Sequence, residues 1–140
     1  MQGYNLILVY NTGCYKILMC KRNKPPYEGL LNLVGGKVEI GENGLSAAYR
    51  ELFEETSITA DDIKLFHLMD FTYYCYNCYV EVYVGKLKQD IPVYGDENEL
   101  LWVDADSDVF DKEVFAGSGN IGHIVEETRK CAAEILLINF

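Results

Sequence analysis

The sequence predicts an α+β fold in which a mixed central sheet carries a helix on each face. Several segments rich in β-branched and aromatic residues are separated by turn signals, and two amphipathic helical patterns lie far apart in the chain. Strands interrupted by two separated helices favour this arrangement. The chain has 140 residues, of which 49% are hydrophobic, and it contains no linker or repeat. We therefore expect one domain over residues 1–140.

The first half of the chain predicts three strands. Two apolar segments flank the turn signal Asn11-Thr12-Gly13, which indicates a hairpin. A loop with two prolines and a glycine follows, and then a short apolar segment that ends at Gly35-Gly36. We expect strands at residues 4–10, 15–20 and 30–34, with a loop at 23–29.

A helix is predicted from about residue 43 to about residue 56. Leu45, Ala48, Leu52 and Phe53 recur at helical spacing and predict the face that packs on the sheet. The opposite face is acidic.

The second half predicts three more strands and a second helix. Residues 63–75 and 78–87 are rich in tyrosine and valine, and Asn77 joins them. A polar loop then precedes a short strand. The pattern of residues 107–115 fits either a loop or a helical turn. A Gly-rich break follows, and after it comes another amphipathic helical pattern. We expect a loop at 89–98, a strand at 100–103, and a helix from the break at 117–120 to about residue 136.

Charge and cysteine content narrow the function classes. The net charge of −10 argues against binding to nucleic acid polymers or to anionic membranes. No apolar run is long enough to span a bilayer, and the N-terminus has no signal-peptide pattern. The five cysteines are an odd number, so we expect reduced thiols and a cytoplasmic protein. Cys75 and Cys78 have metal-site spacing, but they lie in a predicted strand pair, which disfavours a redox or zinc role.

Three glutamates give the strongest functional signal. Glu51, Glu54 and Glu55 would gather on one helix face, where like charges repel. A hard cation such as Mg²⁺ prefers oxygen ligands and would remove the conflict. The alternative is a solvated acidic face, but the ordered spacing from Gly36 to Ile58 is rarely met by chance.

That spacing resembles the signature of the Nudix family, Gly-x5-Glu-x7-Arg-Glu-U-x-Glu-Glu-x-Gly-U, in which U is a bulky aliphatic residue. The chain matches from Gly36 through Glu42 and Arg50 to Ile58, and it departs only at Ser57, where the family has glycine. The resemblance implies a Nudix-type α/β/α sandwich. It also implies hydrolysis of a nucleoside diphosphate linked to another group, with Mg²⁺ or Mn²⁺ as cofactor.

The resemblance further implies roles for individual residues. Glu51, Glu54, Glu55 and the Gly35 carbonyl would bind the metal, and Glu42 would support its shell. Arg50 would orient a catalytic glutamate, either Glu51 or Glu54. A glutamate outside the signature often assists, and we favour Glu97 over Glu99 because it lies deeper in its loop.

The substrate is predicted from residues outside the signature. The segment around Asn32 and Lys37 resembles that of MutT-type members, in which an asparagine at this position contacts an oxidised purine. Asn120 lies near another base-reading position, and Arg22 could hold phosphates. The alternatives are a strand-edge role for Asn32, a helix cap for Asn120 and a solvated strand end for Arg22.

We therefore expect a nucleoside triphosphate pyrophosphohydrolase of the 8-oxo-dGTP type that releases the monophosphate and pyrophosphate. Its partner would be a small nucleotide, and the protein would be a monomer or a homodimer. The alternatives are an ADP-ribose or nucleotide-sugar hydrolase, and a non-catalytic domain that senses a nucleotide.

Overall fold

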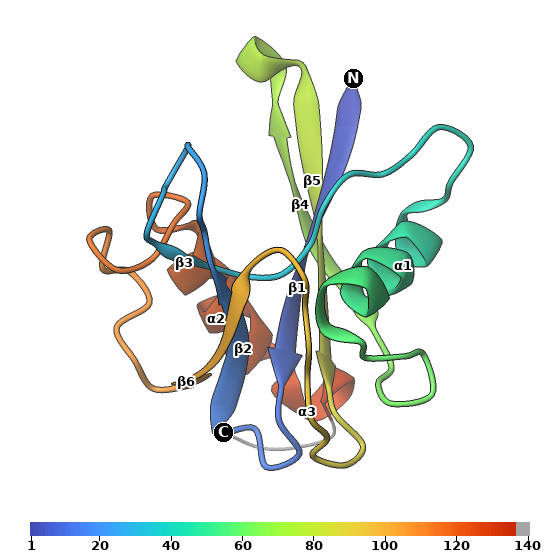
Figure 1. The fold of residues 1–140 in the computed structure, drawn as a ribbon, viewed down its shortest axis with the longest axis vertical. Helices are drawn as coiled ribbons and strands as arrows, with labels where there is room; N and C mark the ends of the chain where they lie inside the picture. The colour runs from blue at the N-terminus through green and yellow to red at the C-terminus, as the bar shows by residue number, and fades with distance from the viewer. Residues whose placement is uncertain (137–140) are drawn as a thin grey trace.

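The computed structural model describes residues 1–136, and the predicted α+β architecture is confirmed (Figure 1). The elements are β1 (Gln2–Tyr10), β2 (Lys16–Lys21), β3 (Leu31–Asn32), α1 (Gly44–Thr56), β4 (Phe66–Tyr73), a 3₁₀ turn (Tyr74–Tyr76), β5 (Cys78–Lys86), β6 (Glu99–Asp104), α2 (Asn120–Lys130) and α3 (Ala132–Ile135).

The sheet is mixed. Its strand order is β3-β2-β1-β5-β4, and β6 also pairs with β2. β1 and β5 run parallel over their whole lengths, whereas β4 and β5 form an antiparallel hairpin. β1 and β2 are antiparallel, as the predicted hairpin requires, but they share one registered pair, and β2 pairs along its length with β6.

Helices cover both faces of the sheet, which gives the expected sandwich. α1 packs over one face on a buried cluster that includes Ile7, Val9 and Tyr83. α2 and α3 contribute to a second cluster on the other face, with Leu8 and Val82 among its members. Adjacent residues of β1 thus point into opposite cores, as strand geometry requires.

The predicted core face of α1 is partly wrong. Ala48 and Leu52 are fully buried, but Leu45 is 44% exposed and Phe53 is 54% exposed. Ala47 and Thr56 complete the buried face instead. The small alanines let the helix lie close to the sheet, so the bulky residues at its flanks remain outside.

The ends of α1 follow the local chemistry. The side chain of Asn43 accepts a hydrogen bond from the Ser46 amide and caps the helix start. Ser57 ends the helix in the left-handed conformation, with φ +67°, and its amide donates to the Phe53 carbonyl. This conformation explains why the family has glycine at the position.

Several elements differ in extent from the sequence prediction, among them β3, which covers only Leu31–Asn32. β4 begins at Phe66 rather than at residue 63, because Ile63 makes only an isolated bridge to Leu87. The predicted C-terminal helix is divided at Cys131 into α2 and α3. Residues 107–115, for which the sequence allowed a loop or a helical turn, form turns and bends, and Phe115 makes an isolated bridge to Leu31. Within residues 1–136, no helix has the length and apolar character to cross a membrane.

Candidate active site

A glycine turn faces the acidic side of α1. Gly35 has φ +152°, and a Cβ there would collide with the carbonyl oxygen of Asn5. A Cβ on Gly36 would meet the carboxyl group of Glu51. The Gly35 amide donates to Glu55 Oε2 over 3.3 Å. The two glycines therefore let the backbone approach the glutamates of α1.

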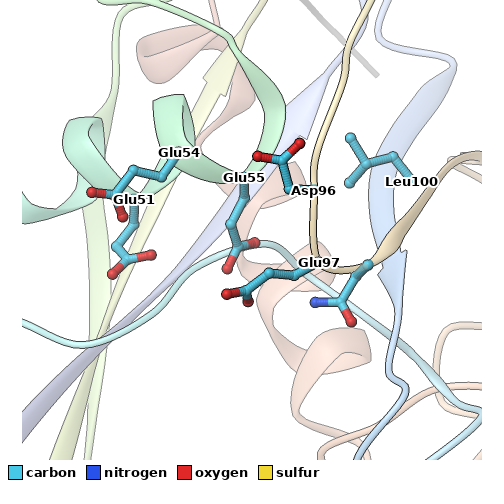
Figure 2. Close-up of a pocket in the computed structure, with 7 residues that line it drawn as sticks. Glu51, Glu54, Glu55, Asp96, Glu97 and Leu100 are labelled. Atoms are coloured by element: carbon cyan, nitrogen blue, oxygen red, sulfur yellow. The ribbon is translucent and has the colours of Figure 1, made fainter.

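The three glutamates line a cavity of about 390 Å³ (Figure 2). Glu51 and Glu55 are partly buried, while Glu54 is exposed. Burial raises the pKa of Glu55 to about 7, and the nearby charges of Glu51, Glu97 and Glu54 act in the same direction against the hydrogen bond from Gly35. Burial also raises the pKa of Glu51.

Arg50 binds three carboxylates at once. Its Nε donates to Glu42 Oε2 over 2.6 Å and its Nη2 donates to Glu42 Oε1 over 2.9 Å, which is a two-pronged contact. Nη1 donates to Glu51 over 3.0 Å and to Glu54 over 3.1 Å. The hydrogen bonds from Arg50 to Glu42 lower the pKa of Glu42 to about 2. Arg50 therefore contacts both Glu51 and Glu54, the candidates for the glutamate that it was expected to orient, and it contacts Glu42 as well.

The loop before β6 closes the other side of the cavity. Asp96, Glu97 and Asn98 line it, with Glu97 directed toward Glu55 in Figure 2. The Glu97 carbonyl accepts a hydrogen bond from Asn23 Nδ2 over 3.0 Å. Glu99 instead lies in β6, where it pairs with Lys21. Of the two candidates from the sequence, Glu97 is the one at the cavity.

Asp96 was missed by sequence reasoning. It lies in the same acidic loop as Glu97 and lines the same cavity. Its position directly before Glu97 in the sequence was the signal that could have identified it.

A second cavity of about 470 Å³ adjoins the glutamates. It shares Glu55 and Asn98 with the first cavity, and we call it the aromatic cavity because four tyrosines line it. Asn32 lines it, and the Asn32 Oδ1 accepts a hydrogen bond from the Leu33 amide. The tyrosines of this cavity are Tyr4, Tyr27, Tyr73 and Tyr76.

The two predicted phosphate-binding cations, Arg22 and Lys37, both line the cleft over the glutamates. Arg22 lines both the aromatic cavity and the larger cleft of about 890 Å³ over the glutamates. Its Nε donates to the Pro26 carbonyl over 2.7 Å. Lys37 lines that cleft, and its carbonyl accepts from Arg50 over 2.9 Å.

Asn120 stands apart from the other site residues. It does not line the aromatic cavity, and Gly119 rather than Asn120 is the cap of α2. Its Nδ2 donates to the Tyr73 hydroxyl over 2.9 Å. Asn120 thus contacts the wall of the aromatic cavity through Tyr73, which lines it.

The donor set suits a divalent metal. Carboxylates of one helix face and the backbone of the glycine turn meet in one cavity, and oxygen ligands are those that Mg²⁺ and Mn²⁺ prefer. Burial is the main cause of the raised pKa of Glu55, and the charges of the neighbouring carboxylates add to it, so a bound cation would offset an unfavourable concentration of negative charge. The residues present therefore fit the ion that the resemblance implies.

A family model described as the NUDIX domain matches residues 3–115. The chain belongs to the Nudix family. As a member it is a hydrolase of pyrophosphate bonds, and Nudix hydrolases act on small nucleotide substrates with divalent metal ions.

Solved structures with the same fold bind or hydrolyse different compounds. An Ap4A hydrolase from C. elegans is 18% identical, with 95% of this chain and 98% of that chain covered and a TM-score of 0.76. A MutT/nudix family protein from Enterococcus faecalis is 17% identical, and this chain spans 62% of its length, with 94% of this chain covered and a TM-score of 0.71. The E. coli dihydroneopterin triphosphate pyrophosphohydrolase is 19% identical, with coverage of 89% and 92% and a TM-score of 0.70. At these identities the likeness shows the Nudix fold alone.

Proposed function

We propose that this Nudix hydrolase is a Mg²⁺-dependent pyrophosphohydrolase of a purine nucleoside triphosphate, with an oxidised purine of the 8-oxo-dGTP type as substrate. The observation that carries the proposal is the aromatic cavity with Asn32 in its wall, which opens onto the glutamate cluster. A base in the cavity would leave its phosphates over the glutamates. The products would be the nucleoside monophosphate and pyrophosphate.

Four groups would hold the ion, namely the carboxylates of Glu51, Glu54 and Glu55 and the carbonyl of Gly35. When bound, Mg²⁺ or Mn²⁺ would offset phosphate charge and lower the pKa of a coordinated water. Arg50 keeps Glu51 and Glu54 in fixed orientations through the hydrogen bonds described above.

Proton removal falls to the carboxylates of this cleft. Glu54 is the most exposed of the three helix glutamates, and Arg50 holds one of its oxygens, so its other oxygen would serve either the ion or the proton. Glu97 faces the same cavity from the opposite loop and would assist.

Recognition of the base rests on the aromatic cavity. Tyrosine rings give a purine flat apolar surfaces, and the Asn32 amide can donate while its oxygen is held by the Leu33 amide. The hydrogen bond from Asn120 fixes the Tyr73 hydroxyl at the cavity wall. Arg22 and Lys37 lie where they would meet the phosphates.

The large cleft supports a second candidate. It extends over the glutamates with a volume of about 890 Å³, which gives room for a second nucleoside or a sugar beyond the pyrophosphate. An ADP-ribose or nucleotide-sugar hydrolase would use that space.

We place the enzyme in the cytoplasm, where its free thiols would stay reduced.

A nucleotide panel tests the proposal. Purified protein with Mg²⁺ is incubated with 8-oxo-dGTP, dGTP, ATP, Ap4A and ADP-ribose, and the products are separated. We expect the highest kcat/KM for 8-oxo-dGTP, and Asn32→Ala should raise the KM for this substrate. Preference for ADP-ribose would favour the second candidate. Binding of a nucleotide without turnover of any compound would indicate a sensor.

A further inference from the structure

Asn5 contacts the glycine turn through both its backbone and its side chain. It lies in β1 and is 1% exposed. The backbone N–H of Asn5 donates to the Gly36 carbonyl over 2.8 Å. The side-chain Oδ1 of Asn5 accepts a hydrogen bond from the backbone N–H of Gly36 over 3.0 Å. Gly36 is thus held at both of its backbone polar groups by one residue of the central sheet.

The turn passes this constraint on to the glutamates. Next to Gly36, the Gly35 amide donates to Glu55, and the Glu51 carboxyl packs against the Gly36 Cα. Asn5 itself makes no hydrogen bond to either glutamate among those of residues 1–136. Its influence on the site therefore runs through the orientation of the Gly35–Gly36 peptide, and hence of the Gly35 carbonyl.

A contribution to folding stability does not explain why an asparagine is buried at this position. Among the described residues, Asn5 Nδ2 is buried and has no hydrogen-bond partner. A buried donor without a partner destabilises a fold. Asparagine does supply an uncharged acceptor for the Gly36 amide, whereas an aspartate would add another negative charge beside the carboxylates of α1.

We propose that Asn5 is a positioning residue, which holds the Gly35 carbonyl in the orientation needed to bind the divalent metal. This inference rests on the proposed function, because it takes the Gly35 carbonyl as a ligand. Residues that orient metal ligands change metal affinity or activity by about 10–100-fold when they are replaced.

The chain offers a matched control. Asn11 is also a buried asparagine, 6% exposed, and its Oδ1 accepts from the amides of Tyr15 and Lys16 in the hairpin turn after β1. Asn11 does not line the cavities at the glutamates. Truncation of Asn11 removes the same kind of hydrogen bond without touching the glycine turn.

The experiment compares Asn5→Ala with Asn11→Ala. Mn²⁺ binding is measured without nucleotide by electron paramagnetic resonance, and Tm is measured without metal. We expect Asn5→Ala to weaken Mn²⁺ binding by about 10-fold or more, with a smaller fall in Tm than Asn11→Ala shows. Asn11→Ala should bind Mn²⁺ as the wild type does. Asn5→Leu, which fills the site without an acceptor, should repeat the loss if Asn5→Ala does not fold.

Activity separates this inference from the proposed function. On any nucleotide that is turned over, Asn5→Ala should lower kcat at saturating substrate and demand more Mg²⁺. Weaker Mn²⁺ binding with no turnover of any nucleotide in the wild type would refute the proposed function and leave Asn5 as a positioning residue. Mn²⁺ affinity equal to that of the wild type in both Asn5 variants would overturn the inference.

Discussion

Replacement of Glu55 by glutamine should stabilise the metal-free protein in alkaline solution. Burial raises the pKa of Glu55 from 4.5 to about 7. A carboxyl with a raised pKa binds its proton more tightly in the folded state than in the unfolded state, so stability falls as pH rises between these two values. Glutamine is neutral and similar in size, and it can still accept the hydrogen bond from Gly35.

The magnitude follows from the pKa difference. Each pH unit is worth about 1.4 kcal/mol, so the full difference corresponds to about 3 kcal/mol. We expect about 2 kcal/mol between pH 5 and pH 8, because water reaches part of this side chain and screens the charge. Glu42 does not interfere, since its lowered pKa affects stability only at more acidic pH.

Urea unfolding in EDTA measures this effect. The free energy of unfolding of the wild type should fall by about 2 kcal/mol from pH 5 to pH 8, and Glu55→Gln should lose most of that fall. Addition of Mg²⁺ should stabilise the wild type at pH 8 and leave the stability of the variant unchanged. The reasoning is refuted if both proteins show the same pH dependence in EDTA.

Three other variants test the geometry of the site. Gly36→Ala should place a methyl group against the Glu51 carboxyl, so kcat should fall by about 10–100-fold while Tm changes little; an unchanged kcat would contradict the close packing. Arg50→Lys should lower kcat to a similar extent with unchanged circular dichroism, because lysine lacks the guanidinium fork that binds Glu42, Glu51 and Glu54. Ser57→Gly should raise the unfolding free energy by about 0.5 kcal/mol, because glycine adopts the left-handed conformation freely. The substitution removes only the weak hydrogen bond from Ser57 Oγ to the Tyr94 carbonyl. A lower Tm would show that this hydrogen bond outweighs the conformational gain.

The helix of the glutamates was the part of the site most accessible from sequence. Glu51, Glu54 and Glu55 share a face because helical spacing is fixed by local geometry. The start of this helix is likewise set by local chemistry, so the sequence predicted it to within about one residue.

The wall of the aromatic cavity was not accessible in this way. Tyr73 and Tyr76 lie where β4 connects to β5, and they line the same cavity as Asn32 although β3 and β4 are the two ends of the strand order. Strand periodicity gives each tyrosine a face but does not give the order of strands. The contact between Asn120 and Tyr73 joins residues 47 positions apart and has no local signature.

The burial of α1 shows a similar limit. The periodic pattern included Leu45 and Phe53, but the fully buried alanines at positions 47 and 48 set the contact line. Which side of an apolar stripe meets the sheet depends on the shape of the sheet, and the helix sequence alone does not contain that shape.

The central claim is that the glutamates of α1 hold a divalent ion for pyrophosphate hydrolysis. Its most direct test is the release of pyrophosphate and 8-oxo-dGMP from 8-oxo-dGTP with Mg²⁺, compared between the wild type and Glu55→Gln. We predict Mg²⁺-dependent release by the wild type and a loss of at least about 100-fold in the variant, beyond the effect of a residue that only supports a ligand. Turnover by Glu55→Gln at the wild-type rate would contradict the claim.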